Sequence, residues 1–454
     1  MTILAVIGAV LLMVFGVALS IALHELGHFL PAKRFGVRVS QFMIGFGPTV
    51  WSRRRGETEY GVKAIPLGGY IRMIGMFPPR AGDAPGTVRA SSTGRFSQLV
   101  DEARSASVEE IQPGDERRVF YGLTVPRKLV IMLGGPVMNL LIAIVLTTFI
   151  LTAHGVQKEQ PGVVLNSISE CVVPAAQAAS TTVCTSDIPK TPAYAAGLRP
   201  GDRVLSVGGV EMTTTSDLGK VIRPRVGEPT QIVIQRDGQQ LTLTATPIRN
   251  TLPQFDEDGQ PVLDAQGVQK TVEAGFLGVM SGPVLAYERQ PLSAVPAAIG
   301  ENLTRTFAGI LAVPQKLVGV WSAVTSDAAR PVDGPMSVVG VGRVAGEIGA
   351  GQLDWLVGGE PVDKVFALIG LIAMLNMMLF VFNLIPLLPL DGGHVAGALW
   401  EGVKRRWASL RGLPDPGPVD VAKALPLAYT VSLVLLAMSV LLIYADVVKP
   451  IKLG

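Results

Sequence analysis

The sequence predicts a polytopic α-helical membrane protein with about four transmembrane helices, an inserted extracytoplasmic β-rich domain and a membrane-associated β-loop. Its 454 residues are 48% apolar and only 17% charged, and the mean hydropathy is clearly positive at +0.42, which disfavours a purely globular enzyme. Four apolar runs are each long enough to cross a bilayer: Ile3–Leu23, Leu129–Ala153, Val365–Leu388 and Ala424–Tyr444. The helices are expected within residues 1–30, 129–155, 364–390 and 424–446.

The first apolar run leads directly into the motif His24-Glu25-Leu26-Gly27-His28. Residues four apart share one face of a helix, so His24 and His28 can bind one zinc ion. Glu25 can then act as the general base towards a metal-bound water. The alternative is a chance pair of histidines, although ionisable groups inside a span are costly and usually functional. A cleaved signal peptide is disfavoured, because the run is too long and lacks a basic segment before it.

A β-rich stretch follows this motif. Gly45–Pro48 predicts a turn, and Glu57–Ala64 and Ile65–Met73 have the composition of strands. Pro79–Arg118 is rich in glycine, serine and charged residues, and it predicts a flexible insertion. Residues 31–128 are therefore expected to form a cytoplasmic-side region with a β-loop at the membrane.

Residues 160–250 predict a compact β-rich domain after the second span. Thr191–Gly209 indicates a short helix, a Pro-Gly-Asp turn and an alternating strand, and two more strands meet at the hairpin turn Asp237-Gly238. This pattern resembles a PDZ domain of the bacterial protease type. Such domains bind an extended peptide by adding it as a strand to a sheet edge.

The rest of this middle region carries weaker signals. Cys171 and Cys184, in an apparent insertion into the β-rich domain, either form a disulfide in an oxidising compartment or remain free. Residues 251–360 predict a linker and amphipathic helices, and Pro291–Val324 contains charges that argue against a span. Gly340–Gly346 lacks the spacing of a nucleotide-binding loop and is interpreted as structural.

Basic residues predict the orientation of the chain in the membrane. Short loops rich in lysine and arginine remain in the cytoplasm, so the segment between the first two spans and the loop at residues 391–423 are expected there. Both termini and the β-rich domain then lie outside a bacterial inner membrane, and the zinc site lies near the cytoplasmic side. The net charge of +3 does not indicate a nucleic-acid surface. The basic residues of the two loops are Lys33, Arg34, Arg38, Arg53, Arg54, Arg55, Lys63, Arg72, Arg127, Lys128, Lys404, Arg405, Arg406 and Arg411.

A zinc site with two histidines and a water requires one more protein ligand. Asp391 is the candidate, because it follows the third span at the same side and depth as His24 and His28. Two nearby prolines break the helix, and irregular backbone at membrane depth survives only where it lines a protein cavity. His394 is the alternative ligand, and a purely helix-terminating aspartate is the non-functional alternative. His154, at the other end of the second span, has no role in this site.

These motifs together resemble the site-2 protease family of intramembrane metalloproteases, and within it the bacterial regulator-of-sigma-E protease branch. The single PDZ-like domain is similar to that of actinobacterial members. The resemblance covers most of the chain, except Pro79–Arg118 and the cysteine loop. The motifs that carry it are His24–His28, Ala32–Val37, Gly45–Pro48, Pro66–Tyr70, Gly135–Asn139 and Asn383–Gly393.

The resemblance implies one Zn²⁺ ion bound by His24, His28 and Asp391, with Glu25 as the catalytic base. Implied partners are single-span membrane proteins such as anti-sigma factors, the lipid bilayer, and peptide at the PDZ-like domain. Asn383 is implied to contact the substrate backbone, Asn139 to add polar support, and the β-loop to hold the substrate extended. The residues implied at the substrate are Asn383, Asn139, Gly68, Gly69 and Tyr70.

The expected activity is hydrolysis of a peptide bond in or near a transmembrane segment. The substrate helix must first unwind, because its own hydrogen bonds shield the bond, and Glu25 then moves a proton from water to the leaving amine. The alternatives are a catalytically silent, PDZ-bearing membrane scaffold and a metal transporter. Both are disfavoured. A scaffold would not need Glu25 as a general base, and a transporter usually needs more metal ligands than these residues supply.

Overall fold

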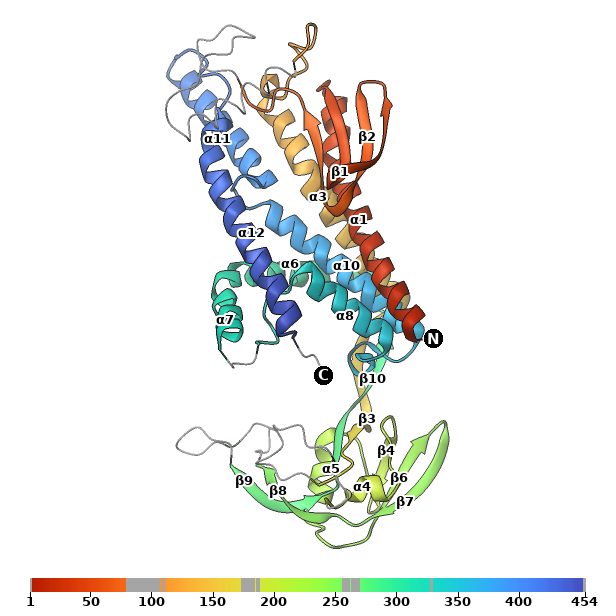
Figure 1. Cartoon of the computed structure of the whole chain (residues 1–454). Coiled ribbons are helices and arrows are strands. Elements are labelled where there is room, and N and C mark those ends of the chain that lie inside the picture. The colour runs from red at the N-terminus through yellow and green to blue at the C-terminus, as the bar shows by residue number, and fades with distance from the viewer. Residues whose placement is uncertain are drawn as a thin grey trace. The chain divides into compact units, whose positions relative to one another are not determined.

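The chain folds into two compact units, residues 1–154 with 290–454 and residues 155–289 (Figure 1). The structure is a computed structural model. It describes residues 2–78, 107, 111–172, 184, 188–254, 262, 270–326 and 330–451. Most of Pro79–Arg118, predicted as a flexible insertion, and most of the segment between the cysteines lie outside the described residues.

Four of the described helices, all in the first unit, are long and apolar enough to cross a membrane, as the sequence predicts. Large apolar side chains on each of them face outwards: Phe15, Val145, Met374 and Leu433 are 66%, 63%, 67% and 67% exposed. A protein surface this apolar is stable only when lipid covers it. The helices are α1 (Thr2–Arg34), α3 (Val125–Phe149), α10 (Pro361–Asn383) and α12 (Leu425–Val448), and α3 continues as the π turn Ile150–His154.

Shorter helices pack among these spans. The helices α6 (Val295–Leu311) and α7 (Val313–Thr325) meet at a bend of 57° and are together apolar enough for a broken span or a re-entrant pair. The helix α8 (Val338–Ala350) packs along α1, so the glycines at 340–346 belong to a packed helix. The remaining short elements of the first unit are η1 (Phe120–Gly122), η4 (Leu292–Ala294), α9 (Asp354–Val357) and η5 (Val421–Ala424).

A long, irregular hairpin of β1 (Val39–Arg55) and β2 (Thr58–Met73) lies beside the C-terminal part of α1 (Figure 1). The chain bends at Gly45 and Gly47, whose φ angles of 91° and 84° favour glycine. Apolar side chains fix the base of the hairpin to α1 and α3, among them Phe29, Val37, Val39, Ile131 and Met132. In register, the segments of the sheet follow the order 69–73, 39–44, 59–62, 51–55, so residues 69–73 form one edge.

The segment after α10 differs from the predicted third span and loop. The helix ends at Asn383 rather than near residue 390, and residues 384–390 form a non-helical turn, because Pro386 and Pro389 cannot donate helical hydrogen bonds. Much of the predicted loop at 391–423 is instead the helix α11 (Asp391–Leu410).

The second unit contains a twisted sheet in the order β10-β3-β4-β6-β7, with β5 beside β4. It extends beyond the predicted 160–250 boundary, because β10 pairs antiparallel with β3 from Val156↔Glu288 onwards, and the start of the predicted linker therefore belongs to this unit. Its strands are β3 (Val156–Ile168), β4 (Arg203–Val207), β5 (Val210–Glu211), β6 (Thr230–Arg236), β7 (Gln239–Ala245), β8 (Ile248–Pro253), β9 (Thr271–Phe276) and β10 (Val279–Glu288).

Besides its apolar core, a buried carboxylate and a disulfide bond stabilise the second unit. The buried Asp202 carboxylate, in the Pro-Gly-Asp turn, accepts hydrogen bonds of 2.7 Å from the Arg199 backbone N–H and from Arg236 Nε. The Sγ atoms of Cys171 and Cys184 are bonded, with their Cα atoms 5.8 Å apart. The described part of this unit also contains the short helices α4 (Pro192–Ala195) and α5 (Thr215–Ile222).

Candidate metal centre

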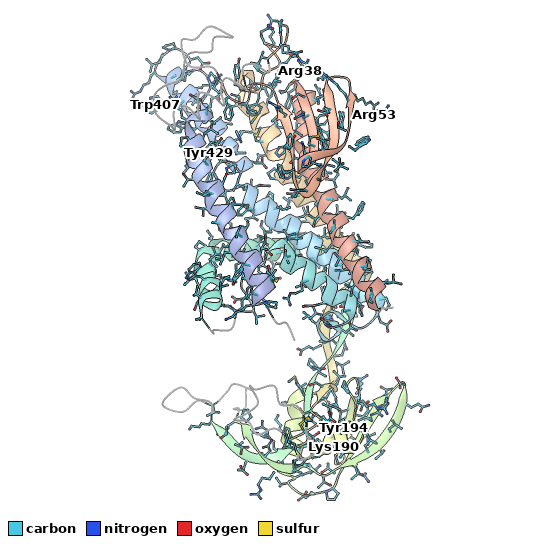
Figure 2. All side chains as sticks on the ribbon, viewed as in Figure 1. Arg38, Arg53, Lys190, Tyr194, Trp407 and Tyr429 are labelled. Carbon is cyan, nitrogen blue, oxygen red and sulfur yellow. A yellow bond between two sulfur atoms is a disulfide. The ribbon has the colours of Figure 1, made fainter. Side chains whose placement is uncertain are left out.

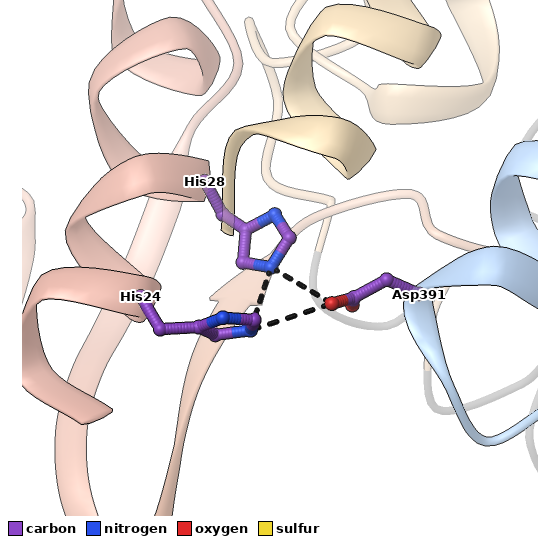
Figure 3. A group of neighbouring side chains, drawn as sticks. All are labelled: His24, His28 and Asp391. Carbon is purple, nitrogen blue, oxygen red and sulfur yellow. Dashed lines mark hydrogen bonds and ion pairs between the residues drawn. The ribbon is translucent and has the colours of Figure 1, made fainter. Parts of the chain in front are cut away.

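The structure brings His24, His28 and Asp391 together at one point of the first unit (Figure 3). Both histidines lie on α1, one helical turn apart, and they point towards α11. Asp391 is the first residue of α11, directly after the proline-containing turn. The turn is tight, since a Cβ on Gly392 would lie 2.2 Å from the Ile385 carbonyl oxygen. This packing fixes where α11 starts and therefore where the carboxylate of Asp391 lies.

The spacing of the three donor atoms fits a tetrahedral zinc ion. Nε2 of His24 and Nε2 of His28 are 3.2 Å apart, and they lie 3.3 Å and 3.4 Å from Oδ2 of Asp391. Zinc bonds of about 2.0 Å at tetrahedral angles require donors about 3.3 Å apart. The donor set of two imidazoles and one carboxylate leaves a fourth position for water, as catalytic zinc sites do.

Groups from α3 orient both imidazoles. Nδ1 of His28 donates to the Ile131 carbonyl oxygen at 2.7 Å, which leaves Nε2 free to bind metal. Nδ1 of His24 lies 3.0 Å from the fully buried amide of Asn139. Nδ2 of that amide faces the imidazole, and its Oδ1 has no partner among the described residues. Rotating the amide by 180° lets Oδ1 accept the proton of Nδ1, which the metal-binding tautomer of His24 requires.

Asn139 therefore contacts a histidine rather than the space where a substrate would lie. The sequence grouped it with the substrate-binding residues, and its complete burial argues for a positioning role instead. A second residue with such a role, Ile131, was missed, because its contribution is a backbone oxygen that carries no sequence signal.

Two glycines of α3 allow the helices to approach closely at this point. A Cβ on Gly134 would lie 2.0 Å from the Gly27 carbonyl oxygen of α1. A Cβ on Gly135 would lie 2.2 Å from Nε2 of His28 and 2.7 Å from Nε2 of His24. The space beside the two donor nitrogens thus exists only because residue 135 has no side chain.

We expect Gly135→Ala to lose most of its bound zinc and its activity, because the added methyl group collides with both histidines. Gly8→Ala, on the α1 helix that carries both histidines but with no heavy atom near the new Cβ, is the control and should resemble wild type. Metal analysis of the purified proteins, with circular dichroism to check folding, measures the effect. A folded Gly135→Ala protein with full zinc would contradict this account of the centre.

Glu25 lies next to this cluster and is nearly buried, with 8% of its surface exposed. The edge segment of β2 passes beside it: a Cβ on Gly69 would lie 2.9 Å from Cγ of Glu25 and 3.0 Å from Cγ2 of Ile21. Gly69 thus brings the sheet backbone against the Glu25 side chain. His24 and Asp391 keep 14% and 22% of their side-chain surface exposed, so the centre is not fully enclosed by protein.

The charge states of the α11 residues agree with a metal site. Burial acts to raise the pKa of the Asp391 carboxyl, but the adjacent imidazoles of His24 and His28 outweigh it and hold the pKa below its ordinary value. Burial lowers the pKa of His394, which favours its neutral form. Among the described residues, His24, His28 and Asp391 form a group whose ligand atoms all lie within 4.8 Å of one another, and His394 is not part of it.

Asn383, Tyr70 and Gly68, which are also predicted at the substrate, do not belong to the group of three ligand residues. Asn383 is the half-buried last residue of α10, eight positions before Asp391. Tyr70 stacks on Phe46 with ring centroids 6.2 Å apart. Gly68 has a positive φ of 93°, and a Cβ there would meet the Phe46 ring.

Comparison with known proteins assigns this architecture to a family. The model of the peptidase family M50 matches residues 12–413. The chain belongs to peptidase family M50. These site-2 proteases are intramembrane zinc enzymes, so this M50 protein is a zinc metalloprotease of the membrane. The silent-scaffold and transporter alternatives are not supported.

Several curated M50 proteins resemble the chain over most of its length. The zinc metalloprotease Rip1 of Mycobacterium tuberculosis (strain H37Rv) is 31% identical over 449 residues, which cover 98% of each chain. The metalloprotease MmpA of Caulobacter vibrioides is 29% identical, covering 87% of this chain and 86% of its own. A putative zinc metalloprotease of Mesorhizobium japonicum is 26% identical, covering 89% and 92%. Zinc is thus the cofactor of this M50 protein.

Proposed function

We propose that His24, His28 and Asp391 bind the catalytic zinc ion and that Glu25 is the general base. The observation that carries this assignment is the tetrahedral spacing of the three donor atoms, with Glu25 adjacent to one of them on the same apolar helix. When bound, zinc would lower the pKa of its water and polarise the scissile carbonyl.

In this proposal, each residue of the site has its own role in catalysis. Glu25 accepts a proton from the attacking water as its oxygen forms a bond to the carbonyl carbon, and it delivers that proton to the leaving amine as the C–N bond breaks. Asn139 and the Ile131 carbonyl hold the two imidazoles in their metal-binding orientation. Asn383 donates to the substrate backbone near the centre.

The edge of the β1–β2 sheet is the proposed site where the unwound substrate is held. Residues 69–73 pair as a strand with residues 39–44, and Gly69 places this edge against Glu25. An extended peptide could add to the edge as a further strand, which would present its backbone to the general base. Gly68, Gly69 and Tyr70 would be the contacting residues.

The proposed substrates are single-span membrane proteins, with anti-sigma factors as the leading class. The second unit is proposed to be an extracytoplasmic PDZ domain. It has a groove of about 430 Å³ between α5 and the strands β9 and β10, lined in part by Leu218, Ile222 and Leu277. This groove fits an extended peptide added beside a sheet edge.

We expect the second unit to control entry of substrates with bulky external domains. Replacing residues 156–288 by a short Gly-Ser linker is feasible, because Val156 and Glu288 are paired neighbours. The shortened protein should cleave a pre-trimmed substrate at the wild-type rate and should also cleave the untrimmed one. Failure of a zinc-loaded shortened protein on the pre-trimmed substrate would instead identify the unit as a required docking element.

Loop charge supports an orientation with the 31–128 and 391–423 regions in the cytoplasm and the second unit outside. Single cysteines test it, since both native cysteines are bonded to each other. In intact cells an impermeant thiol reagent should label Gly238→Cys and spare Arg54→Cys and Arg406→Cys. Labelling in the opposite pattern would invert the protein in the membrane.

A further inference from the structure

The outer face of α11 is an unusual surface for a helix that begins at a proposed zinc ligand. It presents two tryptophans one above the other, together with valine and leucine at helical spacing. Trp400, Val403, Trp407 and Leu410 are 58%, 56%, 56% and 72% exposed. Figure 2 shows Trp407 projecting outwards from the unit, on the same side as Tyr429 of α12.

We propose that this face, the Trp400–Trp407 face, lies in the membrane interface and binds the headgroup of an anionic phospholipid. The chain after α11 folds back and completes a groove of about 660 Å³ there, lined by Trp400, Val403, Lys404, Trp407, Ala408, Leu413, Pro414 and Pro416. Its walls are apolar, as an acyl chain requires, and Lys404 supplies a cation at its rim.

The charges beside the groove complement an anionic lipid. Lys404, Arg406 and Arg411 are all exposed, and the Arg411 guanidinium lies over the Trp407 ring, 4.3 Å from its centroid. Tryptophan favours the headgroup level of a bilayer, and an amphipathic helix with a basic polar face binds anionic lipid surfaces. A zwitterionic lipid carries a cation beside its phosphate and so offers these residues no net negative charge.

The position of α11 in the chain favours lipid as the ligand of the Trp400–Trp407 face. It lies between the end of α10 at Asn383 and the candidate span that starts at Val421. The segment that connects two consecutive spans leaves the bilayer and returns to it on the same side, so both ends of this segment lie at one membrane surface. The opposite face of α11 is already occupied: the buried Glu401 carboxylate pairs with Lys128 of α3 at 2.7 Å.

This inference rests on the proposed function in one respect, the role of Asp391. The first residue of α11 is that proposed ligand, and the Lys128–Glu401 pair holds the same helix to α3. A lipid bound to the outer face would hold the helix from its other side. We therefore expect lipid binding at the Trp400–Trp407 face to support cleavage.

The test measures lipid binding to the full-length protein in detergent by native mass spectrometry. Phosphatidylglycerol and phosphatidylcholine are titrated in parallel. Each basic residue near an anionic surface contributes about fivefold in affinity, so Lys404→Gln/Arg406→Gln should bind phosphatidylglycerol about thirtyfold more weakly. Arg199→Gln/Arg249→Gln, with the same charge loss at exposed sites of the second unit, should bind it like wild type. Binding of phosphatidylcholine should not change.

Unchanged phosphatidylglycerol affinity in the Lys404→Gln/Arg406→Gln variant would overturn the proposal, as would equal affinity of wild type for the two lipids. Disulfide cross-linking of Trp400→Cys between two copies in vesicles would show a protein interface and overturn it too. Lipid binding is measured without proteolysis, so an error in the assignment of the catalytic residues would not alter this result. In nanodiscs with phosphatidylglycerol, the double variant should cleave several-fold more slowly than wild type, and an unchanged rate would overturn the link to Asp391.

Discussion

Glu25→Gln is expected to retain wild-type zinc and to lose peptide-bond cleavage by a factor of at least about 10². The amide has nearly the shape of the carboxylate, so the packing of the side chain beside Gly69 is preserved. It cannot accept the proton of the attacking water at neutral pH, and no proton then reaches the leaving amine. The measurement is cleavage of a single-span substrate by purified protein, with zinc determined on the same samples.

Glu59→Gln is a matched control for this variant. Glu59 lies on β2 of the same hairpin, where its carboxylate accepts a 3.1 Å hydrogen bond from Gln41 Nε2, and it is remote in sequence from the zinc motif. It should keep both zinc and activity. Turnover by Glu25→Gln within a few-fold of wild type would remove Glu25 from the catalytic role and leave the metal centre itself unaffected.

The membrane helices and the histidine pair could be predicted because their signals are local in sequence. A run of apolar residues such as Ile3–Leu23 defines a span without reference to the rest of the chain. The i, i+4 spacing of His24 and His28 defines one helical face in the same way. Asp391 was predicted less directly, from the need for a third ligand at the same depth.

The features that the sequence did not predict depend on contacts between distant residues. The buried Lys128–Glu401 pair joins residues 273 positions apart, and no local pattern relates them. The second unit extends past residue 250 because β10 returns to pair with β3. The helix α11 was assigned to a loop, because its mixture of glycine, tryptophan and basic residues lacks the apolar run of a span.

The role of Asn139 could be predicted from the sequence only in part. The resemblance implied a supporting polar role and grouped it with the substrate-binding residues; in the structure its amide lies against His24 and is fully buried. A polar residue in the middle of an apolar helix indicates function, but only the packing of α3 on α1 shows which atom it serves. Removing a residue that hydrogen-bonds a metal ligand typically lowers metal affinity or activity by 10- to 100-fold.

The second large effect concerns the metal ligands. We expect His24→Ala, His28→Ala and Asp391→Ala each to lose nearly all bound zinc and all cleavage, because three donors 3.2–3.4 Å apart define the site and two cannot hold the ion in a fixed geometry. His394→Ala is the matched control, since it removes an imidazole from the same helix as Asp391, one turn further along. That variant should keep its zinc.

The comparison between Asp391 and His394 decides which residue of α11 completes the site. Oδ2 of Asp391 lies 3.3 Å and 3.4 Å from the Nε2 atoms of His24 and His28, whereas His394 is not among the three residues whose ligand atoms lie close together. If metal analysis finds full zinc in Asp391→Ala and none in His394→Ala, the third ligand is the imidazole, and the start of α11 must turn when the ion binds. If Asp391→Ala loses zinc and His394→Ala keeps it, the third ligand is the carboxylate. The proline-containing turn after α10 then serves to place that carboxylate opposite the two histidines of α1.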